Sequence, residues 1–382
     1  MLVPKLRFEE FKYEWSYYTF KELISLKSNT YNPQKDRKEY NCIELEHINQ
    51  ENGTINGYTG SRGQKSCKNF FKKGSILFGK LRPYLKKYWL ASFSGVCSSE
   101  IWVLNSKNTQ VINNGFIFYI IQSHYFIELC KLSTGSKMPR ADWSYIKEQS
   151  VAIPGVEEQK KISKLLLLLD KKIELQQRKI EALKIYKRGL IQRIYQKNYN
   201  NKIKMEKILI QKYIRNTNDE NYNVYSVSNK DGFILQTEQF KDRIVASEDT
   251  KNYKVVETDD FAYNPARINV GSIARMKKDT KGIISPMYIC FKCNEEILPE
   301  YLEYFFESSK FTYEMNKRLE GSVRMCLSYE SMLNIPIELP NKNEQEEISK
   351  ILNNLSDKIK LEEEKWIKLK KLKRGLLQKM FI

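Results

Sequence analysis

The first residues that could do chemistry form the glycine-bounded segment 74–80, which reads Gly-Ser-Ile-Leu-Phe-Gly-Lys. It fits the G-x-x-x-x-G-K pattern of a loop that cradles nucleotide phosphates. That pattern continues with Ser or Thr, because the hydroxyl binds Mg²⁺, whereas this chain has Leu81. The interior Ile-Leu-Phe is typical of a buried strand. We therefore interpret the segment as a strand and not as a nucleotide site.

Other catalytic or metal-binding sets are also incomplete. Residues 290–293 read Cys-x-x-Cys, which is one cysteine pair, whereas a structural zinc site needs four ligands. The chain has two histidines, His47 and His124, which leaves little for histidine-based metal or triad chemistry. Residues 264–266 read Asn-Pro-Ala, so the Asn-Pro-Pro-aromatic motif of adenine-N6 methyltransferases is absent. We expect no catalytic residue, no metal site and no cofactor in this chain.

The charge of the chain indicates a polyanionic partner. Its 382 residues include 65 Lys and Arg against 46 Asp and Glu, for a net charge of +19. A basic surface of this size favours nucleic acid or an anionic membrane. The charge is uneven, because residues 1–152 carry +9 and residues 201–338 carry −1. Nucleic-acid binding by the second segment would therefore depend on a local patch.

Polar loops containing glycine or proline supply candidates for reading bases. Direct readout takes Arg, Lys, Asn, Gln, Ser or Thr on base edges, while phosphate contacts position the protein. Such loops recur near equivalent places in the two halves of the chain. We predict DNA contacts from Arg62, Lys65, Lys80, Arg82, Lys137, Arg140, Asn264, Arg267, Asn269, Arg275, Ser322 and Arg324. We expect phosphate contacts from Lys72, Lys73, Lys86 and Lys87.

Two long helices are the clearest elements that could position these loops. Apolar residues step by four and three along both segments, which is the heptad seam of a coiled coil. Each seam is interrupted by polar residues at matching places, Gln176 with Glu362 and Lys187 with Lys373. We predict that the seams of the two helices pack together. The seam residues are Ile162, Leu166, Leu169, Ile173, Ile180, Leu183, Leu190, Ile348, Leu352, Leu355, Ile359, Trp366, Leu369 and Leu376.

An internal repeat relates the two halves of the chain. The segment from Glu158 to Gln192 matches the segment from Glu344 to Gln378 at an offset of 186 residues, with about half of the aligned positions identical. The offset also holds outside the helices, and it is far too long for a solenoid. We predict a first globular domain, a first helix, a second globular domain and a second helix, with the bounds 1–152, 153–200, 201–338 and 339–382.

The domain between the two helices lets the chain return, which makes antiparallel pairing plausible. Short strand-like runs and apolar helical runs alternate in both domains. We therefore predict an α+β fold with two similar domains, separated by two long helices that form an antiparallel coiled coil with approximate two-fold symmetry. Pairing between two copies of the chain is the alternative.

The composition excludes several other classes. Hydrophobic residues make up 41% of the chain, which is too many for a disordered protein. The longest apolar runs are too short to span a bilayer, and the first residues lack an apolar signal core. Seven scattered cysteines are most simply reduced thiols. We expect a cytoplasmic protein with no membrane partner.

The sequence resembles the specificity subunits of type I restriction-modification systems. The most specific features are the Ile-Pro or Leu-Pro pairs followed by Glu-Gln, which lead into helices ending in Lys-Arg-Gly-Leu. The resemblance covers the whole chain. The segments that carry it are 4–8, 74–83, 95–100, 153–159, 187–190, 261–269, 285–288, 339–345 and 373–376.

This resemblance implies a role in a larger complex. Each target-recognition domain would read one half of a bipartite, asymmetric double-stranded DNA site, and the helices would set the gap. The helices and their seam residues would also help to dock two methyltransferase subunits, which would carry S-adenosylmethionine and methylate adenine. Restriction subunits, with ATP-driven translocase and nuclease domains, would join them. The cofactors S-adenosylmethionine, ATP and Mg would then lie on partners, and this chain would not be an enzyme by itself.

Two other functions remain open from the residues. A stand-alone DNA-binding nuclease would need a metal-binding carboxylate cluster, which the sequence does not display. A coiled-coil adaptor without a nucleic-acid function would bind polyanions weakly and without sequence preference. DNA binding with sequence preference would distinguish a DNA-reading specificity subunit from the adaptor.

Overall fold

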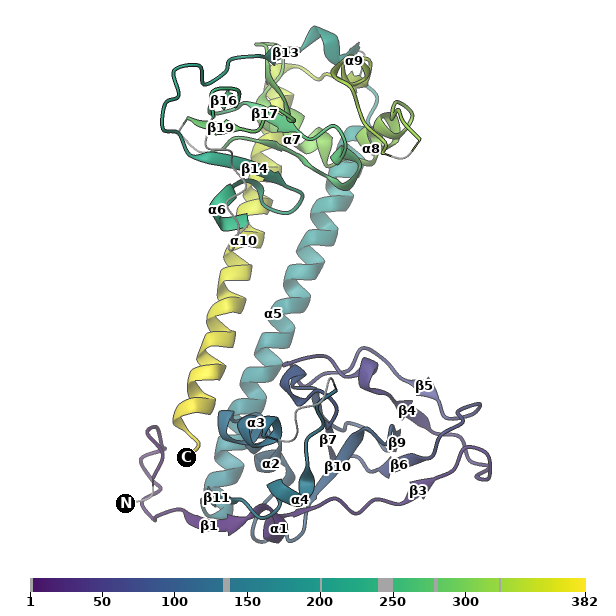
Figure 1. Cartoon of the computed structure of the whole chain (residues 1–382), viewed down its shortest axis with the longest axis vertical. Helices are drawn as coiled ribbons and strands as arrows, with labels where there is room; N and C mark the ends of the chain where they lie inside the picture. Colours follow the sequence, from purple (N-terminus) through teal and green to yellow (C-terminus); the bar gives the residue numbers. More distant parts are fainter. Residues whose placement is uncertain (1–2, 133–137, 200, 240–249, 278–280, 323) are drawn as a thin grey trace. The chain divides into compact units, whose positions relative to one another are not determined.

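The computed structural model describes residues 3–132, 138–199, 201–239, 250–277, 281–322 and 324–382. The chain divides into two compact units (Figure 1). The first unit combines Met1–Gln177 with Glu364–Ile382, and the second is Arg178–Glu363. Each unit therefore takes part of both long helices, α5 (Val156–Gln196) and α10 (Lys342–Lys379).

Three sheets build the first unit. A two-stranded sheet pairs β1 with β11, a four-stranded sheet has the order β2-β10-β7-β8, and a five-stranded sheet has the order β3-β6-β9-β4-β5. Among the described strands of this unit, β4 and β9 pair in parallel and the other pairs are antiparallel. The strands are β1 (Ser16–Thr19), β2 (Ile24–Ser25), β3 (Thr30–Tyr31), β4 (Asn41–Ile43), β5 (Thr59–Gly60), β6 (Lys68–Phe71), β7 (Ile76–Gly79), β8 (Tyr88–Leu90), β9 (Gly95–Cys97), β10 (Ile101–Ser106) and β11 (Ser150–Ile153).

Short helices join the sheets of the first unit to α5. The helices are α1 (Phe20–Leu23), α2 (Asn114–Ile120), α3 (His124–Lys131) and α4 (Trp143–Ile146). Residues 116–121 are all buried, because α2 lies in a core that also contains β7 residues, Ile162 of α5 and Met380 after α10. The side chain of Ser123 caps α3 by accepting a hydrogen bond from Phe126 N. This cap ends the first apolar run and begins a second helix.

The described part of the second unit repeats this topology with one strand fewer, because its last sheet has four strands where the first unit has five. Its two-stranded sheet pairs β12 with β21, and its four-stranded sheets have the orders β13-β20-β17-β18 and β15-β14-β19-β16. The parallel pair is now β14 with β19. The strands are β12 (Lys202–Lys204), β13 (Leu209–Lys212), β14 (Val224–Ser228), β15 (Gly232–Leu235), β16 (Lys254–Val256), β17 (Phe261–Tyr263), β18 (Ile273–Arg275), β19 (Gly282–Ile284), β20 (Ile289–Cys293) and β21 (Pro336–Glu338).

The helices of the second unit are α6 (Gln236–Gln239), α7 (Pro299–Phe306), α8 (Ser309–Asn316) and α9 (Tyr329–Leu333). Three of them, α7, α8 and α9, repeat the order of α2, α3 and α4, whereas α6 lies between β15 and β16 and has no counterpart among the described helices of the first unit. Ser308 caps α8 as Ser123 caps α3. The core contains Tyr301 and Phe305 of α7, Tyr195 of α5 and Leu352 of α10. The sheets and helices in each of the two units confirm the predicted α+β class.

The long helices run antiparallel within each unit. In the second unit, Lys179 of α5 pairs with Glu362 of α10 at 3.0 Å, and Lys197, just beyond the end of α5, lies 3.8 Å from Glu344. Residue numbers that increase along α5 therefore pair with residue numbers that decrease along α10, as in antiparallel helices. The predicted seam residues are buried or half-buried throughout. Several apolar side chains off the seam are exposed, among them Leu175 and Leu361.

Each long helix is anchored near its start by a buried glutamine. In the first unit, Gln159 Nε2 donates to the carbonyl oxygens of Pro154 and Val111, both at 2.8 Å. Its Oε1 accepts a bond from Asn113 N at 3.1 Å. The amide therefore ties the first turns of α5 to the segment before α2, and the unpaired backbone groups there are satisfied.

The same anchor recurs 186 residues later. Gln345 Nε2 donates to Pro340 O at 3.0 Å and to Glu296 O at 3.1 Å, and its Oε1 accepts a bond from Leu298 N at 2.8 Å. Both glutamine side chains are almost fully buried. The repeated Glu-Gln pairs of the sequence thus contain a structural joint between each helix and its own domain.

A lysine interrupts the seam in each unit and lies against a tyrosine ring. In the first unit, Lys373 Nζ lies 2.7 Å from Asp170 Oδ1 and 2.9 Å from Gln122 Oε1. Tyr119 donates its hydroxyl to Asp170 at 3.0 Å, and Lys373 lies 5.9 Å from the centre of that ring. The buried charge is therefore compensated by a carboxylate on α5.

The second unit places its compensating carboxylate elsewhere. Lys187 Nζ lies 3.0 Å from Glu307 Oε2 and 4.9 Å from the centre of the Tyr304 ring. Tyr304 is hydrogen-bonded to Ser356 at 3.2 Å, and Ser356 occupies the position that Asp170 has in the repeat. The negative charge thus comes from the segment after α7 and not from the partner helix.

Candidate nucleic-acid interface

Two predicted loops of the first unit meet beside the end of β7. Arg82 N donates to Pro139 O, and Ala141 N donates to Lys80 O, each at 2.8 Å. These two hydrogen bonds therefore join the loop after β7 to the segment before α4. Arg82 is exposed, and within the described part of the chain no hydrogen bond or ion pair is seen for its guanidinium. The structure thus presents Arg82 at this junction as an exposed cation without a described partner.

Other predicted residues of this junction have different surroundings. Arg140 is paired with Glu100, with Nε 3.0 Å from Oε2. Lys80 is half-buried. Lys137 lies outside the described residues. Arg82 is consequently the most available cation among these positions.

The second unit forms the same junction from different residues. Leu327 N donates to Pro265 O at 3.1 Å, which corresponds to the Ala141–Lys80 bond of the first unit. Tyr263, the last residue of β17, also donates its hydroxyl to Leu327 O at 3.2 Å. Leu327, which follows the predicted segment 321–324, is therefore joined to the predicted segment 264–269.

A tight turn presents Arg324. Glu320 and Cys326 exchange two backbone hydrogen bonds, at 2.9 and 2.8 Å. Gly321 has a φ of +108°, and a Cβ there would lie 2.5 Å from Arg324 O. Only glycine fits this position without moving the loop. Ser322 and Arg324 are both exposed, and no described residue pairs with their side chains.

The adjoining loop presents Arg267. Its backbone N donates to Asn264 O, while Asn264 Oδ1 accepts a bond from Ala266 N, both at 3.0 Å. Asn264 is buried, so it shapes the turn and does not offer its amide to a ligand. Arg267 and Asn269 are exposed and, among the described residues, carry no side-chain partner.

Three predicted residues lie away from these junctions. Arg62 and Lys65 follow β5 in the five-stranded sheet, where Arg62 lies 3.5 Å from Glu39. Arg275 on β18 is buried among three carboxylates, with contacts of 2.6 Å to Asp259, 2.5 Å to Glu300 and 3.0 Å to Glu303. We therefore do not include Arg275 among the proposed DNA contacts.

Two of the four lysines expected to contact phosphates are engaged within the protein. Lys86 pairs with Glu51 at 2.9 Å, and Lys87 Nζ donates to Leu45 O at 2.5 Å. Lys72 and Lys73 are exposed. The sequence could not distinguish the two engaged lysines from the two exposed ones, because the partners of Lys86 and Lys87 lie more than 30 residues away along the chain.

Sequence reasoning missed two exposed side chains beside the arginines. Tyr84 follows Arg82-Pro83, and Met325 follows Arg324; both are more than 40% exposed. A tyrosine ring can stack on a base or sugar, and methionine gives an adaptable apolar contact. An aromatic residue directly after Arg-Pro in a loop was the available signal for Tyr84.

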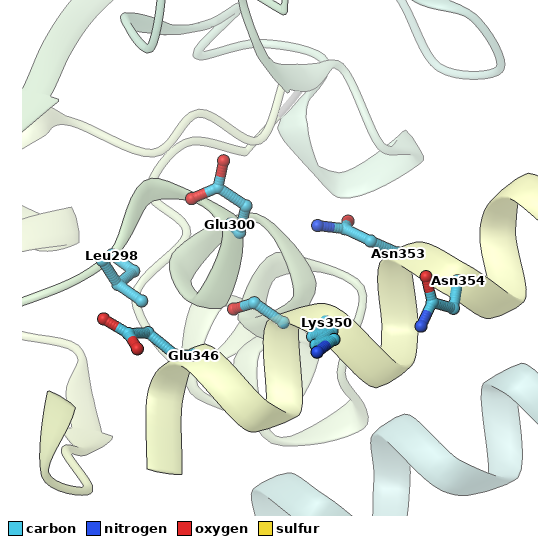
Figure 2. A pocket seen from close by; sticks show the side chains of 7 residues that line it. Leu298, Glu300, Glu346, Lys350, Asn353 and Asn354 are labelled. Atoms are coloured by element: carbon cyan, nitrogen blue, oxygen red, sulfur yellow. The ribbon is translucent and has the colours of Figure 1, made fainter. Parts of the chain in front are cut away.

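A pocket of about 400 Å³ lies in the second unit, between the start of α7 and the first turns of α10 (Figure 2). Ser349 Oγ is buried there and has no hydrogen-bond partner among the described residues. The pocket contains none of the predicted DNA contacts. Its lining consists of Leu298, Glu300, Glu346, Ser349, Lys350, Asn353 and Asn354.

The cysteine pair considered in the sequence lies on β20. Burial raises the pKa of Cys290 and of Cys293 to about 12 each, which keeps both thiols protonated and unreactive near neutral pH. Among the described residues, no three His, Cys, Asp or Glu side chains are placed to hold a metal ion. The same residues include no helix that could cross a membrane.

A comparison with a protein-family model also finds two related segments in this chain, in agreement with the junction that recurs in both units. The sequence model described as "Type I restriction modification DNA specificity domain" matches residues 12–184 and 200–371. The chain belongs to this family. The two matched copies coincide with the internal repeat, and the resemblance stated from the sequence is confirmed.

Individual members of the specificity family are similar to the chain over different lengths. The specificity subunit of the type I restriction enzyme EcoDI from Escherichia coli is 29% identical over 154 residues. That match covers 39% of this chain and only 33% of the relative, so it spans about a third of the relative's length.

Solved structures share the fold. The S subunit of a type I restriction-modification system from M. genitalium superposes with a TM-score of 0.61 at 16% identity, covering 100% of this chain and 99% of that one. A chain from a study of complex assembly and conformational transition in a type I restriction-modification system gives a TM-score of 0.59 at 15% identity. It covers 96% of this chain and 97% of the other.

Proposed function

We propose that this chain is the DNA-reading subunit of a type I restriction-modification complex. Each unit reads one half of a bipartite, asymmetric double-stranded DNA site, and α5 and α10 set the gap between the halves. The chain itself does not catalyse a reaction. Methyltransferase subunits supply S-adenosylmethionine chemistry, and restriction subunits supply the chemistry that uses ATP and Mg²⁺.

One observation carries this proposal. The same backbone hydrogen bond, Ala141–Lys80 in one unit and Leu327–Pro265 in the other, joins the same two loops in both repeats. In each unit the joined loops present exposed arginines without a described partner. Arginine is the side chain that most often reads guanine in the major groove. Two such places on one chain fit a two-part site.

The differences between the units support two unlike half-sites. The first junction offers Arg82 and Tyr84, whereas the second offers Arg267, Arg324 and Met325. Base readout depends on the identity and placement of individual side chains. Two identical half-sites would require similar sets of exposed side chains at the two junctions.

Exposed apolar residues at repeat-equivalent positions support docking of two copies of one partner. Leu175 and Leu361 are 186 residues apart and are 55% and 56% exposed. Tyr186 and Leu372 are related in the same way and are 62% and 53% exposed. Apolar residues that stay exposed on a helix mark interaction surfaces when they recur as a set.

Selection of binding sites from random duplex DNA tests the function. The chain, assembled with its methyltransferase subunits, should select two separated base blocks that differ in sequence. The chain alone should neither methylate nor cut DNA in the presence of S-adenosylmethionine, ATP and Mg²⁺. Nuclease or methyltransferase activity that follows this chain through purification would contradict the proposal, as would selection of no sequence.

Variants of the exposed leucines test the docking step. Leu175→Asp and Leu361→Asp should each weaken binding of one methyltransferase copy, because a charge replaces apolar contact area. Gln378→Asp on the exposed side of α10 is the matched control and should leave assembly unchanged. Native mass spectrometry of the assembled complex counts the bound copies, and full occupancy in both leucine variants would reject this docking surface.

A further inference from the structure

The turn that presents Arg82 has an unusual backbone. Residues Pro83–Leu85 form a single 3₁₀ turn, and both flanking residues are left-handed, with φ values of +50° for Arg82 and +48° for Lys86. Side chains with a Cβ avoid this region, because the Cβ approaches the following carbonyl oxygen. Proline after Arg82 restricts that residue further. Such strain persists only where the surroundings enforce it, and it concentrates at functional sites.

The repeat provides an internal comparison. In the second unit, Ile268–Val270 form the equivalent 3₁₀ turn, and the residue that ends it, Gly271, has a φ of +90°. Lys86 and Gly271 thus share a left-handed position at an offset of 185 residues. The second unit fills it with the residue that adopts this conformation without strain. The first unit retains a lysine there.

Lys86 contacts Glu51, a second residue whose backbone is left-handed. Glu51 has a φ of +59°. Its backbone N donates to Lys86 O at 3.1 Å, and its carboxylate lies 2.9 Å from Lys86 Nζ. The hydrogen bond from Lys86 holds the pKa of Glu51 below its usual value. Glu51 and Lys86 are therefore joined twice, through backbone and side chain.

Other bonds fix the rest of the turn. Leu85 N donates to Arg82 O at 2.9 Å, and Gly79 N donates to Lys87 O at 2.8 Å. Together with the bond from Arg82 N to Pro139 O, these contacts hold both ends of the turn. Arg82 is then the exposed cation on a backbone that cannot easily rotate.

We propose that Lys86, paired with Glu51, is a positioning residue that fixes the direction of the Arg82 side chain for base readout. This inference rests on the proposed function and adds that the two units differ. The first unit presents its arginine from a clamped turn. The second uses a glycine-ended turn that lacks the equivalent lysine.

Measurements on the full complex with single base-pair variants of the selected site test this role. Arg82→Ala should reduce discrimination by about tenfold at one or two base pairs of one half-site. Lys86→Gly keeps the left-handed backbone without strain but removes the ion pair. It should reduce discrimination at the same base pairs, while the other half-site stays within about twofold. Glu51→Gln should act in the same direction, and Lys86→Arg should retain wild-type discrimination.

The combination of Arg82→Ala with Lys86→Gly separates positioning from independent contacts. If Lys86 acts through Arg82, the double variant loses no more discrimination than Arg82→Ala alone. Additive losses, or a uniform loss over all base-pair variants, would overturn the proposal and place Lys86 on a phosphate. Lack of any effect from Arg82→Ala, in a complex that still selects its site, would overturn it too. A complex that selects no site contradicts the proposed function itself.

Discussion

Lys373 of α10 and Asp170 of α5 form an ion pair of 2.7 Å in the seam of the first unit, with side chains only 10% and 19% exposed. Gln122 and Tyr119 complete the hydrogen bonds around them. An ion pair on a mostly apolar seam is stabilising relative to an unpaired buried charge, but not necessarily relative to apolar residues of the same size. Its use is to fix which turn of α10 faces which turn of α5.

A double-mutant cycle measures this pair. Lys373→Met should destabilise the first unit by about 2–4 kcal/mol, because Asp170 is left without a cation. Adding Asp170→Asn removes that charge and keeps an acceptor for Tyr119, so most of the loss should be recovered. Urea unfolding of the four proteins gives the coupling. Equal effects of Lys373→Met in both backgrounds would show that the two residues are not coupled.

Gln159→Ala should destabilise the first unit, and Gln345→Ala the second. Each change leaves three backbone groups without this partner, one buried and two partly buried, at a cost of about 2–4 kcal/mol. Amide hydrogen exchange should show faster exchange confined to the unit that carries the substitution. Gln378→Ala, an exposed glutamine of α10, is the control. Similar exchange in all three variants would mean that water replaces the lost bonds.

Arg82→Ala and Arg324→Ala should each relax selection at one half-site only. A base contact by either guanidinium predicts a loss of about 1–3 kcal/mol at one base pair. Competition binding with single base-pair variants across both half-sites measures the effect. Equal losses against every variant would place these arginines on phosphates.

Lys72→Ala and Lys73→Ala should weaken binding to all sequences alike. Each lost phosphate contact should lower the slope of log K against log salt by about 0.9. Titrations at several salt concentrations measure the slope. An unchanged slope would remove these exposed lysines from the interface.

Removing one heptad from each long helix tests the spacer role. Residues 171–177 and 364–370 lie between the Asp170–Lys373 and Lys179–Glu362 ion pairs, so both pairs survive their deletion. Each helix shortens by about 10 Å, which corresponds to about three base pairs. Site selection should return the same half-sites with a shorter gap. An unaltered gap would exclude the helices as its determinant.

Stability should fall at alkaline pH in a way that depends on Tyr304. Burial raises its pKa to about 12, with Glu303 and Glu307 adding to the shift. The unfolded tyrosine ionises near pH 10, so the contribution of this residue is complete below pH 10 and is lost as the pH rises to 12. The free energy of unfolding should fall by about 2–3 kcal/mol over this range. Tyr304→Phe should flatten the decline, whereas the exposed Tyr313→Phe should not.

The repeat and the seam made much of the architecture predictable. Heptad spacing from Ile162 and from Ile348 indicated the two helices, and the polar interruptions at Lys187 and Lys373 were visible as a matching pair. Local patterns could not assign their partners. Asp170 and Glu307 occupy unrelated places in the repeat, so the compensating carboxylate in each unit depends on the tertiary fold.

The candidate site was less predictable, for reasons of backbone and burial. Arg82 and Lys86 adopt left-handed conformations that nothing in their residue types signals. Arg275 reads as a basic loop residue, but the pairing of β17 with β18 places it among carboxylates distant in sequence. The apolar run around Phe116 reads as one helix, yet the cap at Ser123 divides it.

The division of α10 between the units has a consequence for the order of events during synthesis. The second unit is one continuous stretch, Arg178–Glu363, whereas the first needs residues 364–382. Its core includes Met380, with Phe381 stacked on Phe116. A ribosome therefore releases all of the later unit before it delivers the segment that completes the earlier one. The half that is translated first reaches its native packing last, and until then the part of its apolar core that Met380 and Phe381 cover stays open to water.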